Sequence, residues 1–278
     1  MNYRSIVKLL TQNGRSSASS DAAELIAHFL GKPPEWCLAN PDQDLPPNVG
    51  KAVNELISGT PLQYITGRAW FMGDKYFVNP DVLIPQPDTE CLAEAALARL
   101  KTGARVLDLC TGSGCIIISL LKRVVASGTG IELSAPALAV ARRNAEIHKI
   151  GSRLSLIQAD ALDSPLVERL VSEADIIVSN PPYINTDVIE TLSPEVRAEP
   201  RLALDGGEDG MRFYKRFILN YTRLMKREAA MLLEIGYDQA ERVAALSTDA
   251  GVDCDFINDY SGIRRVAVIN GINRAVQE

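Results

Sequence analysis

The sequence has few histidines and no long apolar run. Only two histidines, His28 and His148, occur in 278 residues, which leaves little for a zinc site or a Ser-His-Asp triad. The apolar runs, such as residues 116–121, are much shorter than the about 20 residues that a membrane span requires. The N-terminal segment turns polar at Thr11, without the apolar stretch of a signal peptide. We therefore expect a cytoplasmic protein with no membrane segment and no bound metal.

The chain also lacks a basic excess and a cysteine framework. Lys and Arg number 29 against 35 Asp and Glu, so the formal net charge is −6. A protein that grips nucleic acid usually presents a basic surface, so we expect no direct nucleic-acid partner. The five cysteines form no Cys-x-x-Cys pair, which favours reduced thiols. Hydrophobic residues at 46% and charged residues at 23% indicate a packed globular protein.

The pattern of apolar residues changes along the chain. Before residue 60 it has helical spacing, as in residues 22–30, which predicts a small bundle of short helices. Residues 71–78 then predict a β-hairpin, and several prolines after it mark an extended connection. We therefore predict two domains: residues 1–85, helical with a β-hairpin linker, and residues 86–278.

Beyond residue 103, strand-like apolar runs alternate with helical patterns. The predicted strands are residues 106–109, 129–132, 154–157, 176–178, 231–233 and, less regularly, 264–269. Such alternation predicts an α/β fold with a parallel, doubly wound sheet. In that fold, ligands bind beyond the carboxyl ends of the strands.

The first strand of this sheet leads into a glycine-rich loop. The loop contains Asp108, Cys110, Thr111, Gly112, Ser113 and Gly114. Glycines let the backbone turn tightly against a ligand, and the next helix offers free N–H donors at its start. A dinucleotide-binding loop requires a further glycine where Ile117 stands, which disfavours an NAD-dependent dehydrogenase. Taken alone, the loop fits a tight turn without a ligand equally well.

Acidic residues end or follow the next two strands. Glu132 comes about 20 residues after the loop, where a carboxylate can accept both hydroxyls of a ribose. Asp160 follows the third strand, where it can accept from an adenine amino group. A lone acid at a strand end is usually just solvated. Because acids end three consecutive strands, the pattern favours a nucleoside ligand without a pyrophosphate.

The fourth strand ends in Asn180-Pro181-Pro182-Tyr183. Two successive prolines fix φ and remove two N–H donors, so the neighbouring carbonyls are held rigidly. The side-chain oxygen of Asn180 and the carbonyl of Pro181 can both accept from one planar –NH2 group, beside the flat ring of Tyr183. Elsewhere this tetrapeptide would indicate only a turn. After a buried strand beside the loop and acids, it predicts a clamp for an amide or amino group, with Asn180, Pro181 and Tyr183 as catalytic residues.

Together these segments resemble S-adenosylmethionine-dependent methyltransferases of the seven-strand, Rossmann-like fold. Three more segments, residues 59–67, 83–90 and 199–207, resemble the HemK/PrmC family. Members of that family methylate the side-chain nitrogen (N5) of the glutamine in the Gly-Gly-Gln motif of peptide-chain release factors. The resemblance implies the same activity here, with S-adenosylmethionine as cofactor and class I release factors as protein partners. It also implies that the N-terminal domain helps to dock the substrate.

The resemblance further implies roles for single residues. It assigns the cofactor to Asp108, Cys110, Thr111, Gly112, Ser113, Gly114, Glu132, Asp160, Ala161 and Asn180. Within this set the loop holds the methionine part, Glu132 the ribose, and Asp160 with the Ala161 backbone the adenine. The glutamine amide would bind Asn180 and Pro181, in a slot shaped by Pro182 and Tyr183.

The sequence departs from the family pattern at two positions. Cys110 stands where the family usually has glycine, and Gln86 stands where it usually has arginine. The first departure requires the loop backbone to tolerate a Cβ atom. The second removes a fixed charge from the predicted linker.

Three other interpretations remain open. One is a glutamine methyltransferase acting on a large-subunit ribosomal protein, although residues 84–90 resemble the release-factor group better. Another is a nucleic-acid amino methyltransferase of the adenine-N6 type, which uses a similar Pro-Pro-Tyr clamp. The excess of acidic over basic residues in this chain counts against it. The third is a non-catalytic nucleoside-binding module, against which the complete tetrapeptide counts. For the release-factor methyltransferase we expect a monomer.

Overall fold

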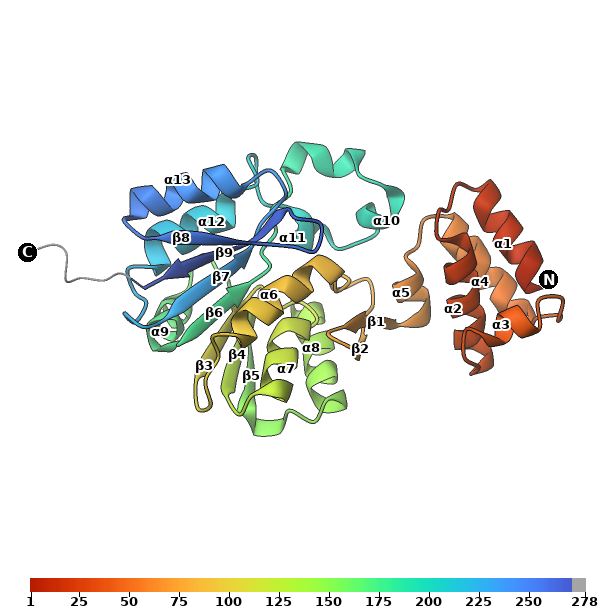
Figure 1. Cartoon of the computed structure of the whole chain (residues 1–278), viewed down its shortest axis with the longest axis horizontal. Helices are drawn as coiled ribbons and strands as arrows, with labels where there is room; N and C mark the ends of the chain where they lie inside the picture. The colour runs from red at the N-terminus through yellow and green to blue at the C-terminus, as the bar shows by residue number, and fades with distance from the viewer. Residues whose placement is uncertain (272–278) are drawn as a thin grey trace, which may run out of the picture. The chain divides into compact units, whose positions relative to one another are not determined.

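The structure, a computed structural model, describes residues 1–271 and divides the chain into two compact units (Figure 1). One unit comprises Met1–Arg68 and Leu192–Ala198, and the other comprises Ala69–Thr191 and Glu199–Glu278. Each unit is the set of segments that pack mainly on one another. Most of the hairpin packs on the second unit, whereas the sequence groups it with residues 1–85. The division into residues 1–85 and 86–278 remains a prediction about which segments act together.

The first unit is helical, as the spacing of its apolar residues predicts. Its helices are α1 (Tyr3–Gln12), α2 (Ala18–Leu30), α3 (Trp36–Ala39), α4 (Pro47–Ile57), α5 (Leu62–Thr66) and α10 (Pro194–Arg197). Their apolar faces pack into one core, in which Ile6, Leu25 and Val53 are fully buried. Arg15, itself mostly buried, pairs with Asp21 and Glu195 and so ties the segment around α10 to this bundle.

The second unit is built on a seven-stranded sheet with the order β5-β4-β3-β6-β7-β9-β8. The strands are β3 (Arg105–Leu109), β4 (Ser127–Glu132), β5 (Leu154–Gln158), β6 (Ile176–Ser179), β7 (Ala230–Glu234), β8 (Cys254–Asn258) and β9 (Arg264–Asn270). Strands β3 to β7 pair in parallel, which confirms the prediction, whereas β9 is antiparallel to both of its neighbours. The sequence did not predict β8.

The direction of strand addition reverses at the centre of the sheet. The chain moves outward from β3 through β4 to β5, then crosses back to place β6 on the other side of β3. The loops after β3 and β6 therefore leave in opposite directions and open a crevice between them. Ligands of doubly wound sheets bind at this switch point.

Helices cover both faces of the sheet (Figure 1). Helices α6 (Pro87–Leu97) and α7 (Cys115–Arg123) pack on one face, together with the hairpin. On the other face lie α9 (Pro165–Glu173), α12 (Arg212–Arg216), the π-helical Phe217–Tyr221 and α13 (Ala240–Ala250). The remaining elements of this unit are α8 (Ala135–Ile147), Gly151–Arg153, Thr186–Thr191 and α11 (Arg201–Leu204). Because both faces are covered, every residue of the central strands β6 and β7 is buried.

The predicted hairpin is present and is fastened to the glycine-rich loop. Strands β1 (Arg68–Phe71) and β2 (Asp74–Phe77) are joined by Met72 and Gly73, whose φ angles of +52° and +77° suit a tight two-residue turn. The fully buried Asn144 accepts from the Phe77 N–H at 2.7 Å and donates to the carbonyl oxygen of Ser113 at 2.8 Å. The hairpin thus braces the loop through one side chain.

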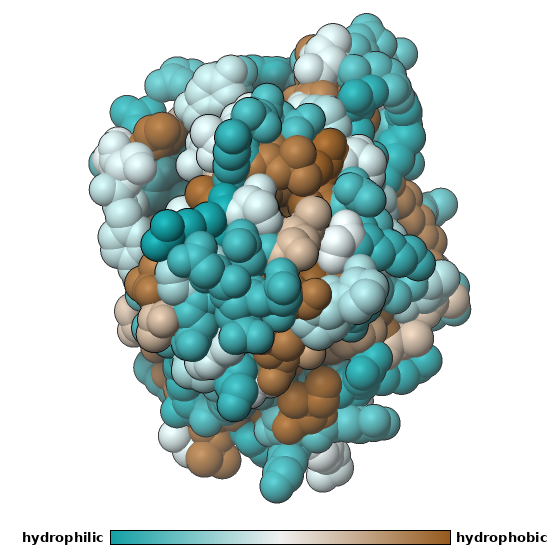
Figure 2. Space-filling view, turned by 90° about the vertical axis from the view of Figure 1, so that its right-hand side faces the viewer, coloured by the Kyte–Doolittle hydropathy of each residue, from teal (hydrophilic) through white to brown (hydrophobic). Residues whose placement is uncertain are grey.

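The surface in Figure 2 is largely hydrophilic, with hydrophobic side chains in small separate groups. None of the helices formed by residues 1–271 is long and apolar enough to cross a membrane. In the same residues, no group of three or more His, Cys, Asp and Glu side chains could hold a metal ion.

Candidate active site

A cavity of about 370 Å³ lies at the carboxyl ends of the central strands, wholly within the second unit. The predicted site residues that line it are Cys110, Gly112, Ser113, Glu132, Asp160, Ala161, Asn180 and Pro182. The predicted residues that do not line it are Asp108, Thr111, Gly114, Pro181 and Tyr183. Its size falls in the range of small-molecule sites, about 300–1,000 Å³. The structure thus brings residues from four strand ends around one space.

The glycine-rich loop makes its turn through three left-handed residues. Cys110, Gly112 and Gly114 have φ angles of +64°, +52° and +79°. Gly114 cannot be replaced without a shift, because a Cβ atom there would lie 2.9 Å from Cδ1 of Ile118. Cys110 carries a side chain in a backbone conformation that disfavours one. Burial raises the pKa of its thiol well above the usual value, so it stays protonated.

Asp108 supports this loop from beneath. Its carboxyl is fully buried, and the Thr111 hydroxyl donates to its Oδ2 at 2.5 Å. Burial raises the pKa of Asp108, and the hydrogen bond from Thr111 lowers it. The pKa that results from all causes together is about 7. The Oδ1 atom has no hydrogen-bond partner in the part of the chain that the structure describes. Direct contact of either residue with a cofactor remains a prediction.

Glu132 and Asp160 present carboxylates to the cavity. Oε2 of Glu132 accepts from Gly112 N–H at 2.9 Å and Oε1 from Ser134 N–H at 2.8 Å, which fixes the side chain. Each carboxylate oxygen retains a second lone pair, so both oxygens can still accept from vicinal hydroxyls. Asp160 is fixed in the same way, by the N–H of Leu162 at 2.8 Å.

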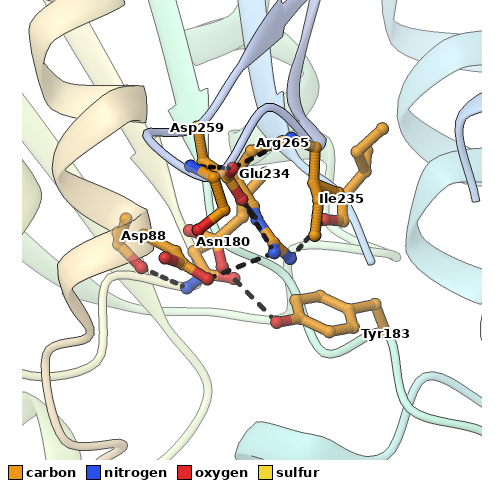
Figure 3. Close-up of polar contacts among 10 residues, drawn as sticks. Asp88, Asn180, Tyr183, Glu234, Ile235, Asp259 and Arg265 are labelled. Atoms are coloured by element: carbon orange, nitrogen blue, oxygen red, sulfur yellow. Dashed lines mark hydrogen bonds and ion pairs between the residues drawn. The ribbon is translucent and has the colours of Figure 1, made fainter. Parts of the chain in front are cut away.

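The Asn180 side chain is oriented by a contact with the first turn of α6 (Figure 3). Its Nδ2 donates to the Thr89 hydroxyl at 3.1 Å, which directs Oδ1 away from Thr89. The hydroxyl of Tyr183 donates to Oε1 of Glu234 at 3.4 Å, and its backbone carbonyl accepts from Nε2 of Gln239 at 3.0 Å. The tetrapeptide is therefore held at both ends.

The segment of residues 199–207 packs directly on the tetrapeptide. The Ile184 N–H donates to Leu204 and the Gly206 N–H donates to Ile184, at 3.0 and 2.8 Å. A Cβ atom on Gly206 would lie 2.7 Å from Cα of Tyr183, so only glycine fits there. This segment also contributes Pro200 to the cavity wall.

Gln86, the second departure from the family pattern, lines the same cavity. It precedes α6, and its Nε2 donates to the carbonyl of Ile84 at 3.0 Å. An arginine in this position would place a charge at the cavity wall, which the neutral glutamine does not.

Sequence reasoning missed three residues that hold the clamp: Thr89, Glu234 and Gln239. Glu234 ends β7, directly after the predicted strand of residues 231–233, so the strand-end rule that selected Glu132 could have found it. It is 2% exposed, and burial raises its pKa to about 7, against the nearby charge of Arg265. The sequence carries no comparable indication for Thr89 or Gln239.

Comparison with known proteins identifies the family. The model described as PrmC N-terminal domain matches residues 3–67, and the one described as Conserved hypothetical protein 95 matches residues 90–207. A curated relative from Geobacter sulfurreducens, named release factor glutamine methyltransferase, is 39% identical over 264 residues, 92% of this chain and 91% of the relative. A relative of the same name from Agrobacterium fabrum is 36% identical over 272 residues, 93% and 92% of the two chains. The chain belongs to the release factor glutamine methyltransferase family.

The resemblance drawn from the motifs is thus confirmed, and the chain is an enzyme of this methyltransferase family. Among solved structures, the hMettl16 catalytic domain in complex with MAT2A 3'UTR hairpin 6 is similar, with a TM-score of 0.56. It is 15% identical, and the match covers 71% of this chain and 76% of that one. This likeness concerns the fold alone, which is the Rossmann-like fold that the sequence predicts.

Proposed function

We propose that the enzyme transfers a methyl group from S-adenosylmethionine to the side-chain nitrogen (N5) of the glutamine in the Gly-Gly-Gln motif of class I release factors. S-adenosylhomocysteine would be the second product. The observation that carries the proposal is the Asn180 amide, fixed by Thr89 beside a cavity lined with nucleoside-binding groups. The name shared by relatives at 36% and 39% identity supports the same substrate.

The residues around the cavity suit S-adenosylmethionine. The loop of residues 110–114 would hold the methionine part, because Gly114 keeps the start of α7 free of a side chain. Glu132 has lone pairs left for the ribose hydroxyls, and Asp160 with the Ala161 backbone would border the adenine. Asn180 would lie between the cofactor and the substrate. Methyl transfer from a sulfonium requires no metal ion.

The chemical difficulty is the nucleophile. An amide nitrogen shares its lone pair with the carbonyl and is nearly inert in water. Bound S-adenosylmethionine supplies a methyl group on a sulfonium, which is a good leaving group. The protein must therefore orient the glutamine and stabilise positive charge that develops on its nitrogen.

Asn180 and Pro181 can do both. The Asn180 Oδ1 and the Pro181 carbonyl would each accept one N–H of the substrate amide. These hydrogen bonds become stronger as positive charge develops on the nitrogen, so they stabilise the transition state more than the ground state. Pro181 and Pro182 have no N–H of their own to compete for these oxygens. Holding the nitrogen in line with the methyl group contributes up to roughly 7–11 kcal/mol. The proton can then leave to water, because methylation acidifies the nitrogen.

A folded protein substrate needs contacts beyond the cavity. We assign this docking to the predicted domain of residues 1–85, with residues 86–278 as the methyltransferase domain. Because release factors act in the cytoplasm, we expect the enzyme to be cytoplasmic, and we expect it to act as a monomer and without a nucleic-acid partner.

Mass spectrometry of the substrate tests this function. A purified release factor incubated with the enzyme and S-adenosylmethionine should gain one methyl group, located on the Gly-Gly-Gln glutamine. A release factor with alanine in place of that glutamine is the matched control and should gain none. Methylation of a large-subunit ribosomal protein or of DNA instead, in parallel reactions, would contradict the assignment.

A further inference from the structure

The turn after β5 carries the two residues proposed to border the adenine, Asp160 and Ala161. Both line the cavity, and the turn lies between the end of β5 and the start of α9. Its first residue, Ala159, donates its N–H to the Glu132 carbonyl at 3.0 Å. A turn has no ladder of backbone hydrogen bonds, so other contacts must fix the direction of its polar groups.

One peptide group in this turn is bonded at both ends. The carbonyl of Ala161 accepts from the Tyr221 hydroxyl at 2.6 Å, and the Leu162 N–H donates to Oδ1 of Asp160 at 2.8 Å. This carbonyl and this N–H belong to the same trans peptide, so they lie in one plane and point in opposite directions. A hydroxyl that fixes the carbonyl therefore also fixes the N–H, and with it the Asp160 carboxylate. Because Oδ1 is held by this bond, Oδ2 is the oxygen available to a ligand in the cavity.

Tyr221 is itself held in place by its neighbours. It is fully buried and ends the π-helical segment Phe217–Tyr221, a rare form of helix that is often found at functional sites. Its ring stacks on that of Phe217, with the centroids 5.7 Å apart, and the Arg216 guanidinium lies 5.0 Å from its centroid. Arg216 in turn pairs with Glu168 of α9 at 2.7 Å. The hydroxyl thus reaches the turn from a fixed position.

We infer that Tyr221 is a positioning residue that aims the Asp160 carboxylate at the 6-amino group of adenine. A carboxylate accepts hydrogen bonds and cannot donate them, so the correct aim favours an amino group over a carbonyl at position 6 of the purine. Tyr221 does not line the cavity, so it acts only through the turn. The inference rests on the proposed function, in which adenine lies beside Asp160.

Two nucleosides test the inference without a release factor. S-adenosylhomocysteine carries adenine, and S-inosylhomocysteine carries hypoxanthine, which has a carbonyl at position 6. Calorimetry gives the Kd of each, and the wild type should bind the adenine form at least about 10-fold more tightly, as expected for a hydrogen bond to a charged group. Tyr221→Phe should weaken S-adenosylhomocysteine about 3- to 10-fold and S-inosylhomocysteine less than about twofold. The preference for adenine should therefore fall.

Tyr214→Phe is the matched control. Tyr214 is also fully buried, and its hydroxyl donates to a backbone carbonyl as well, that of Glu234, at 2.9 Å. The variant loses a comparable buried hydrogen bond away from the turn, so both affinities should stay within about twofold of the wild type. Melting temperatures of Tyr214→Phe and Tyr221→Phe compare the cost of each lost bond to the fold.

A double-mutant cycle tests whether Tyr221 acts through Asp160. In an Asp160→Ala background, Tyr221→Phe should change the affinity for S-adenosylhomocysteine less than about twofold, because the carboxylate that it aims is absent. The same weakening with and without Asp160 would overturn the inference. Equal weakening of both nucleosides by Tyr221→Phe, or an unchanged affinity, would also overturn it, as would a wild type without a preference for adenine.

Two further outcomes are distinguished. If Tyr221→Phe does not fold, Tyr221→Met also lacks the hydroxyl and takes its place in the same comparison. A wild type that binds S-adenosylhomocysteine but does not methylate release factors would refute the proposed function and leave the Tyr221 comparison intact. A wild type that binds neither nucleoside would refute the proposed cofactor and this inference together.

Discussion

The Glu199 carboxylate accepts from the Ile84 N–H at 3.2 Å, across 115 residues of sequence. This bond joins residues 83–90 to residues 199–207, two segments that carry the family resemblance. Both segments line the cavity, so the bond closes part of its wall. Burial raises the pKa of Glu199 to about 7, so the carboxyl that joins the two segments titrates near neutrality.

We predict that Glu199→Gln flattens the pH dependence of stability. Between about pH 4.5 and 7 the native state keeps a proton that the unfolded chain has lost, so the contribution of Glu199 is complete below that window and is lost as the pH rises through it. The wild type should lose up to about 1.4 kcal/mol per pH unit from this group. Urea denaturation of both proteins across the window measures the difference. Parallel curves would contradict the prediction.

Asn180→Ala should slow the chemical step by on the order of 10²–10³, the cost of losing one preorganised hydrogen-bond partner. The affinity for S-adenosylmethionine should change much less than the rate. Single-turnover methylation of a release factor gives the rate, and calorimetry gives the affinity. The exposed Asn220, which does not line the cavity, offers Asn220→Ala as a matched control. A near-wild-type rate in Asn180→Ala would remove Asn180 from its proposed role.

Glu132→Ala should mainly weaken cofactor binding. The carboxylate is proposed to accept the ribose hydroxyls and also holds the N–H groups of Gly112 and Ser134. Loss of charged hydrogen bonds should raise the Kd for S-adenosylmethionine about 10- to 100-fold or more. Glu132→Gln keeps one acceptor and should fall between the alanine variant and the wild type. Unchanged calorimetric affinity in Glu132→Ala would exclude the ribose contact.

Cys110→Gly should stabilise the glycine-rich loop. Cys110 has a φ of +64°, where a side chain costs roughly 1–2 kcal/mol and glycine costs nothing. The greater freedom of glycine in the unfolded chain offsets part of this, so we expect a net gain of about 0.5–1 kcal/mol. Cys110→Ala removes the thiol but keeps Cβ, and should give no such gain. Thermal and urea denaturation of the two variants test the difference, and equal stabilities would disprove the strain.

Much of the fold follows from local patterns. Strands β3, β6 and β7 are buried on both faces, so each contains a short apolar stretch that the sequence displays directly, interrupted in β3 by Asp108. Strand β8 escaped prediction because none of its residues is buried and two of them, Asp255 and Asn258, are of types depleted in strands. The antiparallel direction of β9 depends on its neighbours, which no local pattern reveals.

The sequence by itself determined which residue types follow each strand: the glycines after β3, the acids after β4 and β5, and the Asn-Pro-Pro-Tyr segment after β6. It could do so because strand ends are local features. Only the tertiary structure decided that Thr89 lies against Asn180, that Glu234 lies against Tyr183, and which predicted residues reach the cavity. These contacts join residues that are 91 and 51 positions apart in the sequence. They exist because α6 packs on the sheet and β6 pairs with β7, and no local sequence pattern predicts either arrangement.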